Sequence, residues 1–254
     1  MCVLAHPDDE SLGTGGILAK YAHEEIGTYL VTATRGERGR FDDQGQSPGP
    51  AIVGRVRESE LRAAARELGV REVALLGYGD AELDRVDVAE GTEAIARHIR
   101  RIQPQVIVTF DPYGAYGHPD HIAISQMTTA AIVRASDVHR VSKFYYFIHS
   151  ARKWAAYQAA FKTLTSMVDG TLRAAVVWPD WSITTRVDAT AVWPTVWRAV
   201  QCHKTQMSIY KNLARLSEDD QKIIWGTPEF YRVFSLVNGG RAPETDLFDG
   251  LRPR

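Results

Sequence analysis

In the stretch Val3-Leu4-Ala5-His6-Pro7-Asp8-Asp9-Glu10 a short apolar strand passes directly into a cluster of polar residues. A helical pattern follows at Leu18–Glu25, and Gly27 marks its end. The next run, Thr28–Thr34 (TYLVTAT), has the composition of a buried strand. A strand, a helix and a second buried strand in this order predict the start of a parallel sheet.

The same alternation continues through the first 150 residues. Further strands are predicted at 72–76, 105–110 and 143–148, and further helices at 55–68, 88–102 and 119–134. The segment Gly36–Gly54 is rich in Gly, Pro, Gln and Asp, and it is predicted to be a loop. Strands separated by helices indicate an α/β fold in which helices cover both faces of a mostly parallel sheet, with right-handed crossovers.

The pattern becomes less regular after Ser150. We expect a helix or two, a strand near Ser182–Val187, a helix at Trp193–Cys202 and a last strand at Phe230–Leu236, followed by a tail or an arm from Gly239. No linker or repeat divides the chain. The prediction is therefore one domain over residues 1–254, with a core over about 1–150 and a smaller α+β elaboration over about 151–254 that shapes specificity.

Composition excludes several classes of protein. The 254 residues carry 30 Lys+Arg against 31 Asp+Glu and 44% hydrophobic residues, which rules out a disordered chain and gives no support to a nucleic-acid or polybasic membrane protein. Cys2 and Cys202 make no disulfide framework, and neither a secretory signal nor a membrane-length apolar run is visible. These features predict a cytoplasmic protein. Met1–Leu4 reads as the tail of a strand, as expected where preceding residues are missing.

Two polar motifs follow predicted strands, His6-Pro7-Asp8-Asp9-Glu10 and Tyr116-Gly117-His118-Pro119-Asp120-His121. Ligands of open α/β sheets bind at the carboxyl ends of strands, so both motifs can share one cleft. Imidazole and carboxylate groups are good ligands for zinc and similar ions. His6, His121 and one of the two aspartates supply three ligands, and the other aspartate is free to take a proton from a metal-bound water.

Other interpretations compete with a hydrolytic metal site. Each His-Pro-Asp motif alone is also typical of a turn that caps a helix. Two histidines and a carboxylate can hold iron for oxygen chemistry, although that set has no need of a second adjacent aspartate. A non-catalytic sugar-binding module is a further alternative. The glycines at 13, 15 and 16 lack the spacing of a dinucleotide-binding loop.

The sequence resembles the PIG-L/LmbE-like family of metal-dependent N-deacetylases. The resemblance rests mainly on the two His-Pro-Asp motifs. Weaker matches are Leu12–Gly16, Thr34–Gly39, Arg57-x-x-Glu60-Leu61, Gly77–Asp80 and His203-Lys204-Thr205-Gln206. The resemblance implies a Rossmann-like three-layer fold and removal of an N-acetyl group from an N-acetylglucosamine-type conjugate by metal-activated water. The alternative is an amidase that cleaves a larger thiol- or sugar-amide conjugate at the same metal site.

The resemblance also implies roles for individual residues. His6, Asp9 and His121 match metal ligands, and Asp8 matches the general base. His118 matches the residue that stabilises the oxyanion, with Asp120 expected to raise the His118 pKa and keep this histidine charged. Tyr116 matches a mobile tyrosine in some members and is expected among the catalytic residues. Glu37, Arg57 and Asp80 match positions near the sugar in some members and are expected to bind substrate.

His203 is predicted either to line the cleft and bind substrate or to cap a helix end. The cofactor implied is Zn²⁺, with another divalent ion such as Fe²⁺ as the alternative. The partner implied is a small amino-sugar conjugate rather than a nucleic acid or a membrane, and a homo-oligomer is left open.

Overall fold

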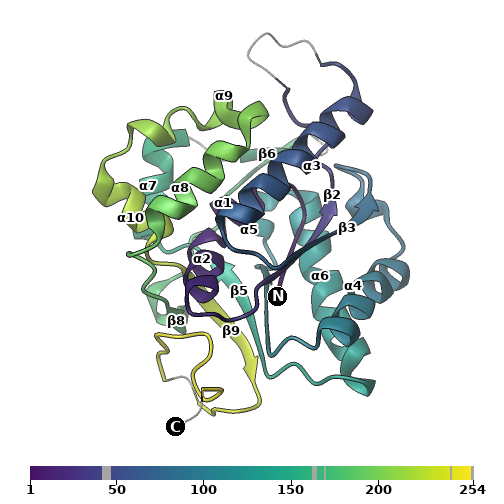
Figure 1. Cartoon of the computed structure of the whole chain (residues 1–254), viewed down its shortest axis with the longest axis vertical. Coiled ribbons are helices and arrows are strands. Elements are labelled where there is room, and N and C mark those ends of the chain that lie inside the picture. Colours follow the sequence, from purple (N-terminus) through teal and green to yellow (C-terminus); the bar gives the residue numbers. More distant parts are fainter. Residues whose placement is uncertain (42–46, 162–164, 169, 241, 253–254) are drawn as a thin grey trace.

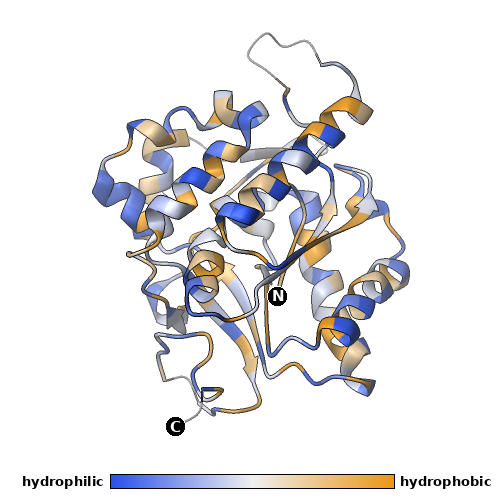
Figure 2. Ribbon diagram, viewed as in Figure 1, coloured by the Kyte–Doolittle hydropathy of each residue, from blue (hydrophilic) through white to orange (hydrophobic). Residues whose placement is uncertain are grey.

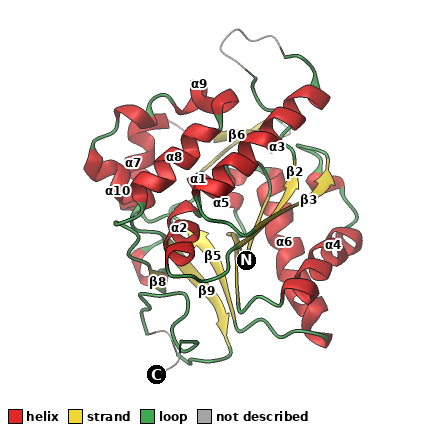
Figure 3. Cartoon of the chain, in the orientation of Figure 1, coloured by secondary structure: helices red, strands yellow, loops and turns green. Residues whose placement is uncertain are grey.

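A seven-stranded sheet forms the centre of the computed structural model, which describes residues 1–41, 47–161, 165–168, 170–240 and 242–252. The strands are β1 (Cys2–Leu4), β2 (Tyr29–Thr34), β3 (Glu72–Tyr78), β4 (Val106–Phe110), β5 (Lys143–Ile148), β8 (Thr185–Arg186) and β9 (Glu229–Ser235). Figure 3 shows these strands between layers of helices. The predicted α/β fold with a mostly parallel sheet is confirmed.

The order of the strands is β3-β2-β1-β4-β5-β9-β8. Strands β1 to β5 pair in parallel, and β9 and β8 add two antiparallel strands at one side. Cys2 in β1 pairs with Leu30 on one side and with Val108 on the other. The direction of winding reverses between β1 and β4, so their carboxyl ends open onto the crevice where ligands bind in folds of this type.

Helices cover both faces of the sheet, as Figure 1 shows. The longer helices are α2 (Gly15–His23), α3 (Pro50–Glu67), α4 (Val88–Ile102), α6 (Pro119–Arg134), α7 (Ala151–Phe161), α8 (Trp193–Cys202) and α10 (Glu218–Trp225). Helix α4 packs against α6 on one face, whereas α2 and α3 both pack against α8 on the other. Strands β4 and β5 are buried along their whole length because both of their faces are covered.

The helices follow the amphipathic pattern of the sequence. Ile95 and Ile99 of α4 are fully buried, while the opposite side of the helix is exposed. Figure 2 shows the resulting alternation of polar and apolar residues around α3 and α4. No helix in the described ranges has both the length and the apolar character that crossing a membrane requires.

The predicted helices at 119–134 and 193–202 have the bounds that the structure shows. Helix α3 instead begins at Pro50, inside the segment Gly36–Gly54 that was predicted to be a loop. The fixed φ of proline suits the first turn of a helix, which explains this earlier start. The part of that predicted loop at 42–46 lies outside the described residues.

Of the two alternatives predicted from Gly239 on, a tail or an arm, the structure shows an arm that is attached to the sheet. Glu244 is buried and accepts hydrogen bonds from Lys143 Nζ at 2.6 Å and from the Tyr145 hydroxyl at 2.7 Å. Arg232 also forms an ion pair with Glu244 at 2.6 Å. The sequence gives no sign of this attachment because Lys143 and Glu244 are 101 positions apart. The hairpin of β6 (Thr165–Val168) and β7 (Thr171–Ala174) was also not predicted.

Candidate active site

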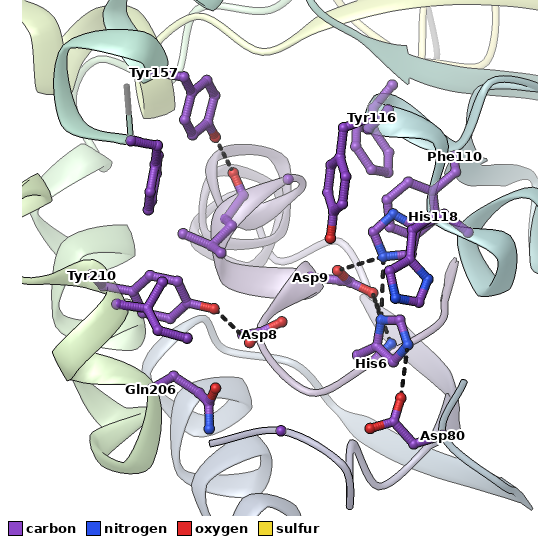
Figure 4. Close-up of a pocket in the computed structure, with 18 of the residues that line it drawn as sticks. His6, Asp8, Asp9, Asp80, Phe110, Tyr116, His118, Tyr157, Gln206 and Tyr210 are labelled. Atoms are coloured by element: carbon purple, nitrogen blue, oxygen red, sulfur yellow. Dashed lines mark hydrogen bonds and ion pairs between the residues drawn. The ribbon is translucent and has the colours of Figure 1, made fainter. Parts of the chain in front are cut away.

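The two predicted motifs meet in one pocket, a cavity of about 490 Å³ beyond the carboxyl ends of β1 and β4. Polar and charged side chains line one part of it, and aromatic side chains line another. Figure 4 shows His6, Asp8, Asp9 and His118 together, although the two motifs are more than 100 residues apart.

Three potential metal-ligand groups converge at the base of the pocket. His6 Nδ1 lies 3.2 Å from His121 Nε2, which in turn lies 3.5 Å from Asp9 Oδ1. His6 Nδ1 and Asp9 Oδ2 are 3.7 Å apart. Ligands bound tetrahedrally at zinc–ligand distances of roughly 2.0–2.1 Å are themselves about 3.3 Å apart. The 3.2 Å between the two imidazole nitrogens fits a single small divalent ion, and Asp9 faces each imidazole through a different oxygen. His118 also offers a nitrogen within 4.8 Å of a nitrogen of each of these histidines.

The hydrogen bonds around the two imidazoles support the same conclusion. His6 Nε2 lies 3.0 Å from Asp120 Oδ2 and 3.2 Å from Asp80 Oδ1, so this nitrogen carries the hydrogen. His121 Nδ1 lies 3.3 Å from the Gly114 carbonyl oxygen and donates to it. These partners assign tautomers in which the lone pairs of His6 Nδ1 and His121 Nε2 both point at the space beside Asp9. A cation offsets the repulsion between them, so the residues present fit a metal ion.

Asp9 is fixed in place by the backbone of its own motif. Its Oδ2 accepts hydrogen bonds from the amides of His6 at 2.7 Å and Ala5 at 3.2 Å. Burial raises the pKa of Asp9 to about 7. Burial alone would lower the pKa of His6, but its contacts with Asp120 and Asp80 raise it to about 10. A metal requires the ionised carboxylate and the neutral imidazole, so its binding releases protons.

Asp8 lies beside the ligand cluster and is held by two donors. Its Oδ2 accepts from Arg57 Nη2 at 2.8 Å and from the Tyr210 hydroxyl at 2.6 Å. Among the described residues no donor binds Oδ1, which leaves this oxygen available at the pocket. Arg57 is itself fixed by the carbonyls of Pro7 and Gly36, at 2.6 and 2.7 Å. The carboxylate of Asp8 is thus oriented by residues from α3 and from the C-terminal part of the chain.

The backbone of Asp8 has a left-handed conformation, with φ of 106°, which is unfavourable for a residue other than glycine. Glu10 stabilises this turn, because its Oε2 accepts the backbone N–H of Asp8 at 2.9 Å. The other oxygen of Glu10 lies 2.7 Å from His203 Nε2 and also accepts the Ser11 hydroxyl. A buried carboxylate and histidine therefore hold the conformation that places Asp8 next to Asp9.

The environment of His118 differs from the expected one. Burial, and after it the nearby His6, lowers the pKa of His118 to about 4 and outweighs the opposite effect of Asp120. The Asp120 carboxylate instead contacts His6 and accepts the amides of Ala81 at 2.8 Å and Leu83 at 3.0 Å. Asp120 does raise the pKa of His118, as expected, but burial and His6 outweigh it, and the charge on His118 stays a prediction.

A neutral His118 can still donate a hydrogen bond. Its Nδ1 accepts the backbone N–H of Asp120 at 3.2 Å, which caps the N-terminus of α6. The hydrogen of the neutral ring consequently sits on Nε2, on a side chain that lines the pocket.

Two residues predicted to lie near the sugar, Arg57 and Asp80, line the pocket, but both are engaged with the site itself. Burial alone would raise the pKa of Asp80, yet its hydrogen bond with His6 lowers it to about 2. Tyr116 also lines the pocket, with its ring centroid 5.3 Å from that of His121.

Two further predicted substrate residues lie behind the pocket wall. The Oε1 atom of Glu37 accepts the amide of Asp80 at 2.9 Å, and Glu37 is not among the residues that line the cavity. His203 is fully buried and bonded to Glu10, so the alternative that it lines the cleft and binds substrate is wrong for this structure.

Sequence reasoning missed Tyr210, Gln206 and the aromatic part of the pocket. Gln206 belongs to the matched segment His203–Gln206, but its position in the pocket could not be read from that match. Tyr210 follows one turn later in α9 (Met207–Tyr210). The sequence holds no local signal for the position of this segment, because it comes close to the first motif only in the folded chain.

The chain is similar to known proteins in both sequence and fold. Residues 1–132 match PIG-L, the GlcNAc-PI de-N-acetylase family. The chain belongs to the PIG-L family. It is 33% identical over 302 residues to a 1D-myo-inositol 2-acetamido-2-deoxy-alpha-D-glucopyranoside deacetylase of Kineococcus radiotolerans, covering 99% of this chain and 82% of the relative. The enzyme of the same name from Nocardiopsis dassonvillei is 34% identical over 286 residues, covering 99% of this chain and 100% of the relative.

Solved structures share the fold of this PIG-L family chain at lower identity. N,N'-diacetylchitobiose deacetylase from Pyrococcus horikoshii superposes with a TM-score of 0.66 at 19% identity, over 91% of this chain and 83% of that one. GalB, the 4-carboxy-2-hydroxymuconate hydratase from Pseudomonas putida KT2440, superposes with a TM-score of 0.67 at 21% identity, over 95% of this chain and 98% of GalB. A deacetylase and a hydratase thus have the same architecture, so the reaction must be argued from the site.

Proposed function

We propose that this chain is a metal-dependent hydrolase that removes the N-acetyl group from an N-acetylglucosamine conjugate. The observation that carries the proposal is that His6 Nδ1, His121 Nε2 and the Asp9 carboxylate converge at one point. The carboxylate of Asp8 lies beside them and has one free oxygen. The relatives from Kineococcus and Nocardiopsis are named as deacetylases of an inositol glycoside of N-acetylglucosamine, which supports a substrate of the same class.

Zn²⁺ is the metal that we propose, held by His6, Asp9 and His121. Two imidazoles and one carboxylate with a position left open for substrate are typical of catalytic zinc sites, and Fe²⁺ accepts a similar set. Such an ion, when bound, polarises a carbonyl group and lowers the pKa of water toward neutrality. Asp80 and Asp120 would orient the His6 ring through its Nε2–H.

Asp8 is the proposed general base. Arg57 and Tyr210 occupy its Oδ2, so Oδ1 is the oxygen that can remove a proton from the attacking water. The same oxygen can then return the proton to the nitrogen of the leaving amine. Hydrogen bonds to its carboxylate and to its backbone N–H hold Asp8 in place.

His118 is the proposed donor to the oxygen of the acetyl carbonyl. His118 Nδ1 accepts the backbone N–H of Asp120, so the hydrogen of the neutral ring stays on Nε2. A neutral imidazole is sufficient to donate a hydrogen bond to a developing negative charge. The role in stabilising the oxyanion is kept from the sequence-based expectation, whereas the charge on His118 is not required.

The experiment that tests the proposal combines metal analysis with mass spectrometry of N-acetylglucosamine conjugates. We expect one divalent ion per chain and the loss of one acetyl group from the substrate, and we expect a chelator to abolish turnover. Full metal occupancy without turnover of any N-acyl amine would contradict the proposal. Oxygen consumption by the ferrous protein would favour oxygen chemistry instead.

A further inference from the structure

A continuous wall of aromatic rings lines one side of the pocket. It begins at the ligand cluster, where Phe110 stacks on His121 with ring centroids 3.9 Å apart, and Phe147 follows 4.6 Å from Phe110. The wall continues with His149, Trp154, Tyr157 and Phe161, whose neighbouring centroids are 5.2 to 6.3 Å apart. This aromatic wall is several rings long and extends from β4 to the end of α7.

Two polar atoms of the aromatic wall are already engaged, whereas Trp154 Nε1 and His149 Nε2 have no hydrogen-bond partner among the described residues. The Tyr157 hydroxyl donates to the Leu12 carbonyl at 2.7 Å, and His149 Nδ1 lies 2.8 Å from the Ile148 carbonyl. Burial lowers the pKa of His149 to about 3, so this ring is neutral. The wall therefore offers mainly carbon and ring faces. A sugar or inositol ring laid along it would lose water from its hydroxyls and gain few hydrogen bonds in return.

Polar groups that suit a sugar lie on the other side of the ligand cluster. Asp80 lies beside His6, and Arg38 and Gln206 line the same part of the pocket. The amide nitrogen of Gln206 donates to the Arg40 carbonyl at 2.6 Å and to Thr205 Oγ1 at 3.0 Å. This leaves the side-chain oxygen of Gln206 as an acceptor for a hydroxyl group. Figure 4 shows Asp80 and Gln206 on one side of Asp9, and Phe110 and Tyr157 on the other.

An amide bond has two substituents, an amine part and an acyl part, and the two sides of the pocket match them. The amino sugar belongs on the polar side, so the acyl group points along the aromatic wall. We propose that the wall is an acyl-binding site and that this chain hydrolyses N-acyl groups longer than acetyl. The inference rests on the proposed hydrolase function and extends it. Water adds across the amide, the C–N bond breaks, and the products are a linear carboxylate and the free amine.

A series of N-acylglucosamines tests the inference directly. The acyl group is lengthened from acetyl through butyryl and hexanoyl to octanoyl, and kcat/KM is measured for each with the zinc-loaded protein. We expect kcat/KM to rise by up to about fourfold for each added methylene until the chain passes the end of the wall, as burial of a methylene group predicts. We also expect hexanoate to inhibit more strongly than acetate, which reports on binding without turnover.

Variants of the wall identify where the gain arises. Trp154→Ala shortens the wall, and Phe161→Gln places a polar group at its half-buried end. Each is expected to lower the ratio of hexanoyl to acetyl kcat/KM several-fold. Trp181→Ala is the matched control, since Trp181 is exposed and does not line the pocket. The ratio should stay at the wild-type value in this control, and unfolding of each variant is measured alongside so that loss of stability is recognised separately.

Three results would overturn the inference. One is a kcat/KM that falls steadily beyond acetyl, and another is a hexanoyl-to-acetyl ratio that Trp154→Ala and Phe161→Gln leave unchanged. The third is a gain in a parallel series of alkyl N-acetylglucosaminides, because the wall would then hold the group attached to the sugar. Failure of the proposed function itself looks different, since no member of either series would then be hydrolysed.

Discussion

His203 Nε2 lies 2.7 Å from Glu10 Oε1, and both side chains are fully buried although they are 193 positions apart in the chain. Burial alone would raise the pKa of Glu10, but His203 lowers it, and Glu10 in turn raises the pKa of His203. The second oxygen of Glu10 accepts the backbone N–H of Asp8. This ion pair therefore ties the end of α8 to the backbone of the proposed general base.

His203→Ala should destabilise the protein by about 3 kcal/mol, because removing one partner of a buried pair leaves the other without compensation. Turnover should fall at least tenfold with the metal content unchanged, since the Asp8 turn loses its support. Denaturant unfolding, metal analysis and deacetylation rates measure these effects. The exposed His23 provides the control, and His23→Ala should stay within about 0.5 kcal/mol of the wild type. A His203→Ala protein with wild-type stability would contradict the argument.

Asp8→Asn should lower kcat by about 10²- to 10⁴-fold, which is the usual contribution of a general base. The metal content should not change, because Asp8 is not among the three proposed ligands. Asp84→Asn, at an exposed carboxylate outside the pocket, is the control. Loss of metal from Asp8→Asn, measured by elemental analysis, would instead make Asp8 a ligand and leave Asp9 as the candidate base.

Tyr210→Phe should lower kcat about tenfold while KM and metal content stay near wild type. The substitution removes one of the two donors that fix Asp8 Oδ2, and a hydrogen bond to a charged group contributes about 1.5–3 kcal/mol. Tyr157→Phe makes the same chemical change, but the Tyr157 hydroxyl donates to the Leu12 carbonyl rather than to Asp8. Equal effects of the two substitutions on acetyl-substrate turnover would show that Tyr210 has no particular role in orienting the base.

Local patterns in the sequence were sufficient to predict the part of the fold that carries the ligands. The buried strand at 105–110 and the helix at 119–134 are recognisable from apolar runs and from Pro119, and the structure shows both. The two His-Pro-Asp motifs follow strands that the topology places side by side, so their meeting in one pocket follows from strand order.

Contacts between distant segments were not predictable in this way. Tyr210 reaches Asp8 across 202 positions, and the partner of Asp120 is His6 rather than the neighbouring His118. Neither pairing leaves a periodic pattern in the sequence, because each depends on how α9 and α6 pack against the first motif. The same reason explains why the sequence could not distinguish a tail from an attached arm after Gly239, since Glu244 is anchored by Lys143 of β5.

Asp120→Asn should weaken metal binding by about 10- to 100-fold, the usual cost of removing a group that orients a metal-bound histidine. The single oxygen of asparagine replaces only one of the two carboxylate oxygens that accept the N–H groups of Ala81 and Leu83, and the charge beside His6 Nε2 is lost. Thermal unfolding of the variant checks that the fold is retained. Competition with a chelator of known affinity measures the change. Wild-type affinity in Asp120→Asn would mean that Asp80 alone orients His6.

Glu244→Gln should destabilise the protein by about 3 kcal/mol at pH 7, and the difference from wild type should disappear in acid. Burial alone would raise the pKa of Glu244, but hydrogen bonds led by that from Lys143 lower it to about 2. A carboxylate whose pKa is lowered by folding stabilises the native state fully above its unfolded pKa of about 4.3, and that contribution is lost as the pH falls toward the folded value. Unfolding free energies of both proteins, measured from pH 7 down to pH 2, should therefore converge between about pH 4 and pH 2. Curves that stay parallel through this range would show that the ionised carboxylate does not anchor the C-terminal segment.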